Sequence, residues 1–347
     1  MKNVLLVFLI FIGLSSVVLA FEPITDANSI RKLAHQIEGL PQGGIVNLTF
    51  KSKIDDTFQP MLANIPNGYT KTKSWPLLIV LHGLGDGPII VESINSMVQI
   101  GPFGRGDMWY HGEGEQDVLE CIELAKQIFN IDSDRIYLTG FSMGGGGTFG
   151  LGLKYPDIWA ACVPVCGMIG SVDLIPNGIN LPFWVNAGSE DHVVPAKYSK
   201  RAYDSAIELG FKHWKYTEHE GMGHSFWIDW DKIEEWLLSQ KKIKNPSNII
   251  FTSEKPAKAY WAEITEKHDS ARFARINIET ISQTVKVKIS NISDYTLYLK
   301  QAPVDLSKEL TIIENDKQVF KGKLPADGIF SKKFDTREIE KVCTKKP

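Results

Sequence analysis

The chain is poor in cysteine and carries no large excess of charge of either sign. Its four cysteines are too few for a disulfide framework in 347 residues, so we expect buried free thiols, with a long-range disulfide as the alternative in an oxidising compartment. Cys162 and Cys166 lie at the two ends of one apolar run, and they cannot bridge each other if that run is extended. The net charge of −3 argues against nucleic acid or an anionic membrane as a partner.

Metal-binding motifs are missing as well. His213, His219 and His224 do not have the spacing of a zinc site. Asp132 and Asp134 lack the glycine and the distal glutamate that complete an EF-hand calcium loop. We therefore expect no metal and no cofactor.

A long apolar run is present at the N-terminus. Residues 4–18 are almost wholly apolar, they follow Lys2, and small residues precede Phe21 at the usual cleavage positions. This pattern predicts a signal peptide over residues 1–20, cleaved after Ala20, and hence a secreted or periplasmic protein without stable membrane association. A membrane anchor is the alternative, but the run is short for a spanning helix and no basic cluster follows it.

The rest of the chain divides into two patterns. From about residue 76 to residue 240, short apolar runs alternate with amphipathic segments such as residues 121–129, which indicates a mostly parallel sheet flanked by helices. Beyond a charged, proline-containing segment near residues 241–247, the runs alternate with period two and turn residues separate them. We predict an α/β domain over residues 21–244 and a C-terminal, sandwich-like all-β domain with its tail over residues 245–347.

The most informative segment is a G-x-S-x-G run from Gly140 to Gly144, centred on Ser142. It follows an apolar run at residues 135–139 and precedes a glycine-rich helical pattern. Strand, tight turn and helix are the context of a nucleophile elbow, in which the strained turn projects the serine hydroxyl into a cleft. A serine hydroxyl becomes a good nucleophile only when a base takes its proton.

A candidate acid and a candidate base follow in chain order. Asp191 comes just after an apolar run at residues 183–188, and His224 lies in a glycine-rich loop after a strand pattern at residues 213–217. The order Ser, Asp, His, each residue near the end of a predicted strand, is typical of the α/β-hydrolase fold. Glu190, the neighbour of Asp191, is the alternative acid.

Backbone donors and aromatic side chains complete the candidate site. A glycine-rich loop follows the very apolar run at residues 76–81, and we expect the N–H groups of Leu84 in this loop and of Met143 to form an oxyanion hole. Three aromatic residues are candidates for the lining of a substrate pocket, with ordinary packing as the alternative. They are Trp109, Tyr110 and Trp227.

Several segments together resemble one group of proteins. They lie at residues 101–106, 112–118, 131–140, 141–145 and 155–161. Over roughly residues 40–240 the chain resembles secreted esterases related to feruloyl esterases, polyhydroxybutyrate depolymerases and the catalytic domains of prolyl oligopeptidases. The resemblance implies an α/β-hydrolase fold with Ser142 as nucleophile, Asp191 as acid and His224 as base. Two family features are absent: the cysteine-rich framework of the depolymerases and the β-propeller of the oligopeptidases.

These observations favour a secreted serine hydrolase that cleaves carboxylic esters through an acyl-enzyme. The expected substrate is a small ester or an acyl group on plant polysaccharide. The alternative is a serine peptidase of prolyl-oligopeptidase type acting on short peptides, for which Glu113 and Glu115 are candidate ligands of a peptide amine. A non-catalytic binding protein is a third class, against which the complete set of Ser142, Asp191 and His224 argues.

Overall fold

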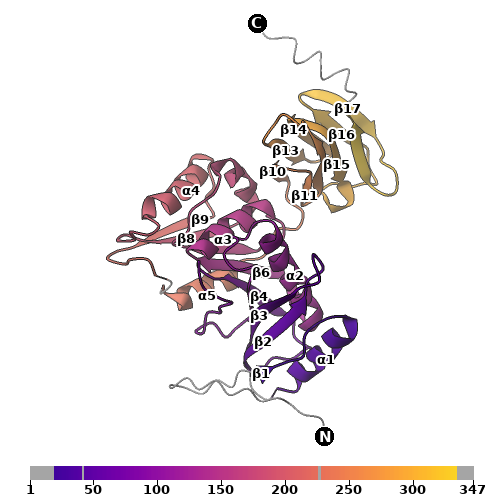
Figure 1. Ribbon diagram of the computed structural model, residues 1–347. Coiled ribbons are helices and arrows are strands. Elements are labelled where there is room, and N and C mark those ends of the chain that lie inside the picture. Colours follow the sequence, from indigo (N-terminus) through magenta and orange to yellow (C-terminus); the bar gives the residue numbers. More distant parts are fainter. Residues whose placement is uncertain (1–18, 41–42, 226–227, 334–347) are drawn as a thin grey trace.

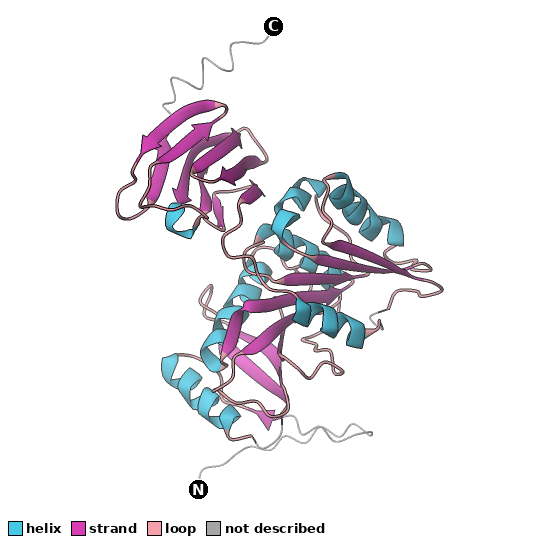
Figure 2. Ribbon diagram, turned by 180° about the vertical axis from the view of Figure 1, so that it is seen from behind, coloured by secondary structure: helices cyan, strands magenta, loops and turns pink. Residues whose placement is uncertain are grey.

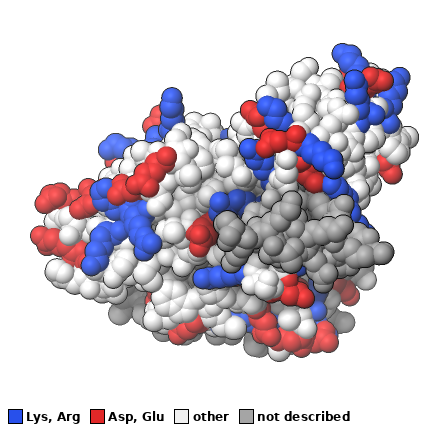
Figure 3. Space-filling model, turned by 90° about the horizontal axis from the view of Figure 1, so that it is seen from above, with Lys and Arg blue, Asp and Glu red and all other residues white. Residues whose placement is uncertain are grey.

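The computed structural model describes residues 19–40, 43–225 and 228–333 (Figure 1). The predicted signal peptide lies almost entirely outside these residues, as does the candidate pocket residue Trp227. Within the described ranges, no helix combines the length and the apolar character that crossing a membrane requires. Lys and Arg side chains are interspersed with Asp and Glu on the face shown in Figure 3, as the small net charge suggests.

The first elements of the chain are a helix and three strands, and the strands form one edge of a large sheet. Asp26 caps α1 (Ala27–Glu38), where its Oδ1 accepts hydrogen bonds from the N–H groups of Asn28 and Ser29 and so satisfies two free donors at the helix start. The strands β2 (Gly44–Lys51) and β3 (Phe58–Ile65) pair antiparallel, and β1 (Leu19–Ala20) pairs parallel to β2.

The sheet continues with six strands that pair parallel to one another. They are β4 (Trp75–Leu81), β5 (Val98–Pro102), β6 (Ile131–Phe141), β7 (Ala161–Val165), β8 (Phe183–Gly188) and β9 (Trp214–His219). The order across the sheet is β1-β2-β3-β5-β4-β6-β7-β8-β9. Because the carboxyl ends of parallel strands meet at one edge, the loops after β6, β8 and β9 lie on the same side of the molecule.

Helices cover both faces of this sheet, as Figure 2 shows. All seven residues of β4 are buried, because alternate side chains enter two different cores. Leu77, Ile79 and Leu81 pack in the core beneath α2 (Glu113–Ile128), α3 (Met143–Lys154) and α4 (Ala196–Glu208), whereas Leu78 and Val80 pack with α5 (Trp230–Ser239). The predicted α/β architecture is confirmed.

One predicted helix begins earlier than its apolar pattern suggested. The amphipathic pattern covers residues 121–129, but α2 begins at Glu113. Gly112 takes a φ of 56°, which glycine adopts without a steric penalty, and this turn allows the helix to start there. Glu113 and Glu115 then place negative charge at the positive end of the helix dipole, which stabilises the first turn.

The C-terminal region folds as two packed sheets with a core of their own, so the predicted all-β domain is also confirmed. Trp261 and Tyr295 are fully buried in this core. One sheet contains β10 (Asn248–Ser253), β13 (Ala274–Ile281), β14 (Thr284–Ser290), β16 (Leu310–Glu314) and β17 (Lys317–Gly322). The other contains β11 (Ala257–Ala259), β12 (Ala262–Lys267), β15 (Ile292–Tyr298) and β18 (Ile329–Lys333).

Specific hydrogen bonds join the sandwich to the first domain. Asn177, in the 3-10 helix η1 (Val172–Asn180), is fully buried. Its Nδ2 donates to the Thr252 carbonyl at 2.9 Å, and its Oδ1 accepts from the Thr252 N–H at 2.7 Å. The Tyr260 N–H donates to Asp157 at 3.0 Å. The two parts of the chain are therefore docked against each other and not only tethered by the linker.

Candidate active site

Ser142 lies at a sharp turn between β6 and α3. Its φ and ψ are 56° and −113°, a conformation that non-glycine residues rarely adopt. Such strain costs about 1–3 kcal/mol and is typical of functional positions. The Ser142 N–H donates to the Val165 carbonyl of the neighbouring strand at 3.0 Å, which holds the turn in place. Ser142 is partly exposed.

The glycines of the elbow are required by close packing. A Cβ on Gly144 would lie 2.2 Å from the Leu81 carbonyl oxygen, and one on Gly140 would lie 2.4 Å from the Gly144 carbonyl oxygen. Both distances are far below a van der Waals contact, and each of these partners is main chain. These glycines therefore allow α3 to begin directly against the sheet, which sets the position of Ser142.

We predict that Gly144→Ala destabilises the protein by roughly 1–3 kcal/mol, because overpacking against main chain forces a backbone shift. Gly150→Ala is the matched control in the same helix, since a Cβ there would meet nothing within 4 Å. That control should stabilise the fold by up to about 1 kcal/mol through helix propensity. Urea unfolding measures both, and equal midpoints for the two variants would contradict the close packing of the elbow.

His224 and Asp191 meet at the same edge of the sheet. The Nδ1 atom of His224 lies 2.8 Å from Oδ2 of Asp191, and the Asp191 side chain is fully buried. The other carboxylate oxygen accepts from the N–H groups of Val193 at 2.9 Å and Val194 at 2.7 Å. Both oxygens thus have donors, which orients the carboxylate.

The environment keeps Asp191 ionised. Burial raises the pKa of this carboxyl, but the hydrogen bonds from His224, Val194 and Val193 outweigh burial, and the net pKa is lower than the usual value for aspartate. An ionised Asp191 accepts the Nδ1–H of His224. This tautomer leaves Nε2 as the acceptor, which is the nitrogen that a general base uses.

The alternative acid does not reach the histidine. Glu190 is exposed, and its main-chain N–H donates to the Met222 carbonyl at 2.9 Å. Of the two neighbouring acids, the structure brings Asp191 onto His224.

The His224 ring also lies against the elbow. Its centroid is 4.6 Å from that of Phe141, the residue that precedes Ser142. The hydrogen bonds of the described residues include none from the Ser142 hydroxyl to His224. Such contacts are often long without substrate and tighten when the reacting complex forms.

The two proposed oxyanion donors occupy different local structures. Met143 is the first residue of α3, so its N–H has no carbonyl one turn earlier in the helix, and the helix dipole adds positive potential there. Leu84 is 57% exposed in the loop after β4. The loop is anchored by buried His82, whose two ring nitrogens lie 2.7 Å and 2.8 Å from the carbonyl oxygens of Gly83 and Phe103. The oxyanion roles of the Met143 and Leu84 N–H groups stay predictions.

A residue next to the site was not identified from the sequence. Cys166 directly follows β7, and its Sγ lies 3.5 Å from the Ser225 carbonyl oxygen. Sγ of Cys166, a carboxylate oxygen of Asp191 and a ring nitrogen of His224 all lie within 4.8 Å of one another. A metal there would have to displace the Asp191–His224 hydrogen bond. The only signal in the sequence was the position of Cys166 at a strand's carboxyl end, on the edge that carries the other three residues.

Cys166 is a poor candidate for a second nucleophile. Burial raises the pKa of its thiol to about 11, so the thiol stays protonated at neutral pH. Cys121 and Cys162 are also buried, and all three are free, as expected from the sequence. Cys343 lies outside the described residues.

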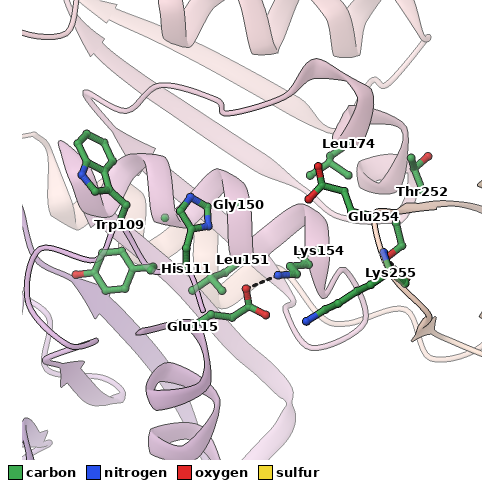
Figure 4. A pocket seen from close by; sticks show the side chains of 13 residues that line it. Trp109, His111, Glu115, Gly150, Leu151, Lys154, Leu174, Thr252, Glu254 and Lys255 are labelled. Atoms are coloured by element: carbon green, nitrogen blue, oxygen red, sulfur yellow. Dashed lines mark hydrogen bonds and ion pairs between the residues drawn. The ribbon is translucent and has the colours of Figure 1, made fainter. Parts of the chain in front are cut away.

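Two of the candidate aromatic residues, Trp109 and Tyr110, lie beside a cavity but differ in their exposure. Trp109 and Tyr110 border a cavity of about 280 Å³ (Figure 4). Tyr110 is buried, and its hydroxyl donates to the His82 carbonyl at 3.1 Å, so it supports the oxyanion loop. Trp109 is 47% exposed. The cavity follows α3 away from Ser142, which is not among its lining residues.

No protein-family model matches the chain. A probable feruloyl esterase C of Aspergillus terreus is 31% identical over 106 residues, covering 26% of this chain and 39% of the relative. An acyl-protein thioesterase 1 homolog of Dictyostelium discoideum is 28% identical over 99 residues, covering 27% of this chain and 45% of the relative. The chain therefore spans less than half the length of either relative.

Among solved structures, a thermostable esterase superposes with a TM-score of 0.50 at 25% identity, covering 57% of this chain and 63% of that structure. The sheet order, the strained serine at the elbow and these matches together show an α/β-hydrolase fold, and the chain is similar to feruloyl esterases and other serine hydrolases.

Proposed function

We propose that the protein is a serine hydrolase that cleaves carboxylic esters through an acyl-enzyme. The observation that carries the proposal is the 2.8 Å contact between Asp191 and His224 at the sheet edge where the strained turn exposes Ser142. A buried, ionised carboxylate that orients an imidazole beside a partly exposed serine is the arrangement that activates a hydroxyl for acyl transfer.

The steps follow from this geometry. Nε2 of His224 takes the proton of the Ser142 hydroxyl as the oxygen attacks the ester carbonyl, and Asp191 stabilises the imidazolium that forms. The N–H groups of Met143 and Leu84 bind the negative oxygen of the tetrahedral intermediate. His224 then protonates the departing alkoxide, which leaves as an alcohol. Water attacks the acyl-enzyme in the same way, and the acid is released as Ser142 regains its proton.

The favoured substrate is an acyl group on plant polysaccharide, and the favoured location is outside the cytoplasm. The feruloyl esterase name of one relative supports the first choice, and the apolar run before Phe21 supports the second. For the domain boundaries we propose those that the sequence indicates. The hydrolase domain covers residues 21–244, and the β-domain begins at residue 245.

The contacts of Glu115 and Glu113 argue against a peptidase. Glu115 is almost fully buried. Its carboxylate forms an ion pair with Lys154 and accepts a hydrogen bond from the Tyr155 hydroxyl. Glu113 lies 3.6 Å from Arg105. Both acids that were candidates for binding a peptide amine already have partners, so the ester remains the favoured substrate.

Three substrates test the proposal directly. We expect the full chain to hydrolyse p-nitrophenyl acetate and methyl ferulate, with a kcat/KM well above that for a dipeptide p-nitroanilide. The physical reason is that an ester needs only the nucleophile and oxyanion donors, whereas a peptide amine also needs a free acid. Faster cleavage of the anilide than of either ester would transfer the proposal to the peptidase.

We predict that a fragment ending at Lys244 still hydrolyses p-nitrophenyl acetate, because Ser142, Asp191 and His224 all precede this residue. Its melting temperature should be lower than that of the full chain, since the paired amide of Asn177 loses both contacts with Thr252. Asn177→Ala in the full chain removes these two hydrogen bonds while the β-domain stays in place. Its melting temperature therefore shows how much of the fragment's loss of stability comes from them. A soluble, cooperatively melting fragment without small-ester activity would show instead that the β-domain shapes the active site.

A further inference from the structure

The cavity beside α3 lies between the two domains. Its walls come from the loop residues 109–111 and Glu115, from α3 and η1, and from residues 252–255 at the end of β10. Figure 4 shows Trp109 at one end, His111 and Gly150 in the middle, and Glu254 and Lys255 at the other end. Both domains therefore contribute to one elongated site that the reaction steps do not use.

The floor of the cavity contains a glycine that packing does not explain. Several other glycines of α3 are sterically required: a Cβ on Gly147 would lie 2.5 Å from the Tyr110 ring, and one on Gly152 would lie 2.9 Å from Phe183. A Cβ on Gly150 would meet nothing within 4 Å. Glycine is unfavourable inside a helix, and a common reason for it is close approach of a ligand to the backbone. Gly150 keeps the floor open at the point where the cavity passes over the helix.

The rim of the cavity carries a partly exposed indole on a strained turn. Trp109 and Tyr110 have φ values of 54° and 56°, two consecutive strained residues of the kind that occurs at ligand sites. Tyr110 anchors this turn, because its ring packs on Gly147 and its hydroxyl binds the His82 carbonyl. Trp109 is left 47% exposed at the cavity. The anchored turn thus places an aromatic surface at the cavity, where a ligand can contact it.

Three of the four charged side chains that line the cavity are held in ion pairs, and the fourth, Lys255, offers ammonium donors that can bind a hydroxyl group. Glu115 pairs with Lys154, as the dashed line in Figure 4 marks, and Glu254 pairs with Arg272 at 3.1 Å. Leu151 and Leu174 add apolar surface. Neutralised ion pairs, an exposed indole and a few apolar side chains match a sugar chain, whose C–H faces pack on aromatic rings while its hydroxyls bind polar groups.

The cavity is within reach of the nucleophile. Gly150 is eight residues after Ser142, which corresponds to about 12 Å along the helix axis at 1.5 Å per residue. The segment that carries Trp109 also contacts the oxyanion loop, because Oδ1 of Asp107 accepts from the Gly85 N–H at 2.7 Å. An extended substrate that spans this distance would place its ester at Ser142 and its remote sugar units in the cavity.

We propose that this interdomain cavity binds the carbohydrate part of the ester substrate, as an uncharged oligosaccharide that crosses α3 at Gly150 and packs on Trp109. The proposal rests on the proposed ester hydrolysis, since it names the group to which the acyl chain is attached. It gives the β-domain a role in binding extended substrates.

Isothermal titration of the full-length Ser142→Ala protein with unacylated xylohexaose tests the site without turnover. We expect millimolar or tighter binding, weakened at least tenfold by adding Gly150→Trp, which fills the floor, and likewise by adding Trp109→Ala, which removes the indole. The second substitution keeps the test decisive if the first variant fails to fold. Ile207→Trp is the control, because residue 207 is exposed on α4 and outside the cavity.

Three results would overturn the site. They are the absence of binding to both xylohexaose and cellohexaose, equal affinity in the Gly150→Trp and Ile207→Trp proteins, and tighter binding of a neutral hexapeptide than of either sugar. Hydrolysis of p-nitrophenyl acetate by the wild-type protein is measured separately. Failure of that assay counts against the proposed ester hydrolysis, whereas loss of sugar binding alone counts against the cavity.

Discussion

Ser142→Ala is expected to remove nearly all ester hydrolysis, a loss on the order of 10⁶-fold in kcat by the precedent of serine proteases. The loss should be this large because the turn between β6 and α3 exposes one hydroxyl beside His224, and no covalent intermediate can form without it. The same substitution should abolish labelling by an organophosphonate probe. Activity assay and intact mass spectrometry after labelling measure the two effects.

The control for this substitution is a second hydroxyl that lies outside the site. Ser93→Ala removes an exposed hydroxyl and should leave turnover and labelling unchanged. The melting temperature of Ser142→Ala should stay close to that of the wild type, because alanine retains the Cβ and the glycine neighbours of the elbow remain. Labelling of Ser142→Ala at the wild-type level would end the assignment of the nucleophile.

Asp191→Asn should reduce turnover by several powers of ten, on the order of 10⁴ in the serine-protease precedent. The amide oxygen can still accept from Val193 and Val194, so the loop should keep its conformation. The amide nitrogen would then face Nδ1 of His224 and donate to it. This contact selects the tautomer that carries its proton on Nε2, which cannot accept the proton of Ser142.

Glu190→Gln is the matched control for Asp191→Asn, since it makes the same chemical change at the adjacent, exposed position. It should alter kcat/KM little, because Glu190 does not contact His224. Steady-state assays of both variants on p-nitrophenyl acetate decide the ranking. If the Glu190 variant lost more activity than the Asp191 variant, the acid role would pass to Glu190.

Much of the fold was predictable because it depends on local patterns. The strand at residues 183–188 has the bounds that its apolar run predicts, and the G-x-S-x-G segment lies between a strand and a helix. Predictions were less complete where the pattern is short or the signal is not apolar. The start of α2, for example, depends on Gly112 and two acids and not on an apolar pattern.

The sequence by itself determined the α/β class, the all-β C-terminal domain and the candidate residues Ser142, Asp191 and His224, because hydrophobic periodicity and motif order are properties of neighbouring residues. Only the tertiary structure decided that Asp191 and not Glu190 contacts His224, since adjacent side chains point in different directions and packing selects between them. It also placed Cys166 beside this pair and opened the cavity between α3 and β10. Both features join segments far apart in the chain, and such contacts depend on sheet order and domain docking, which no local pattern encodes.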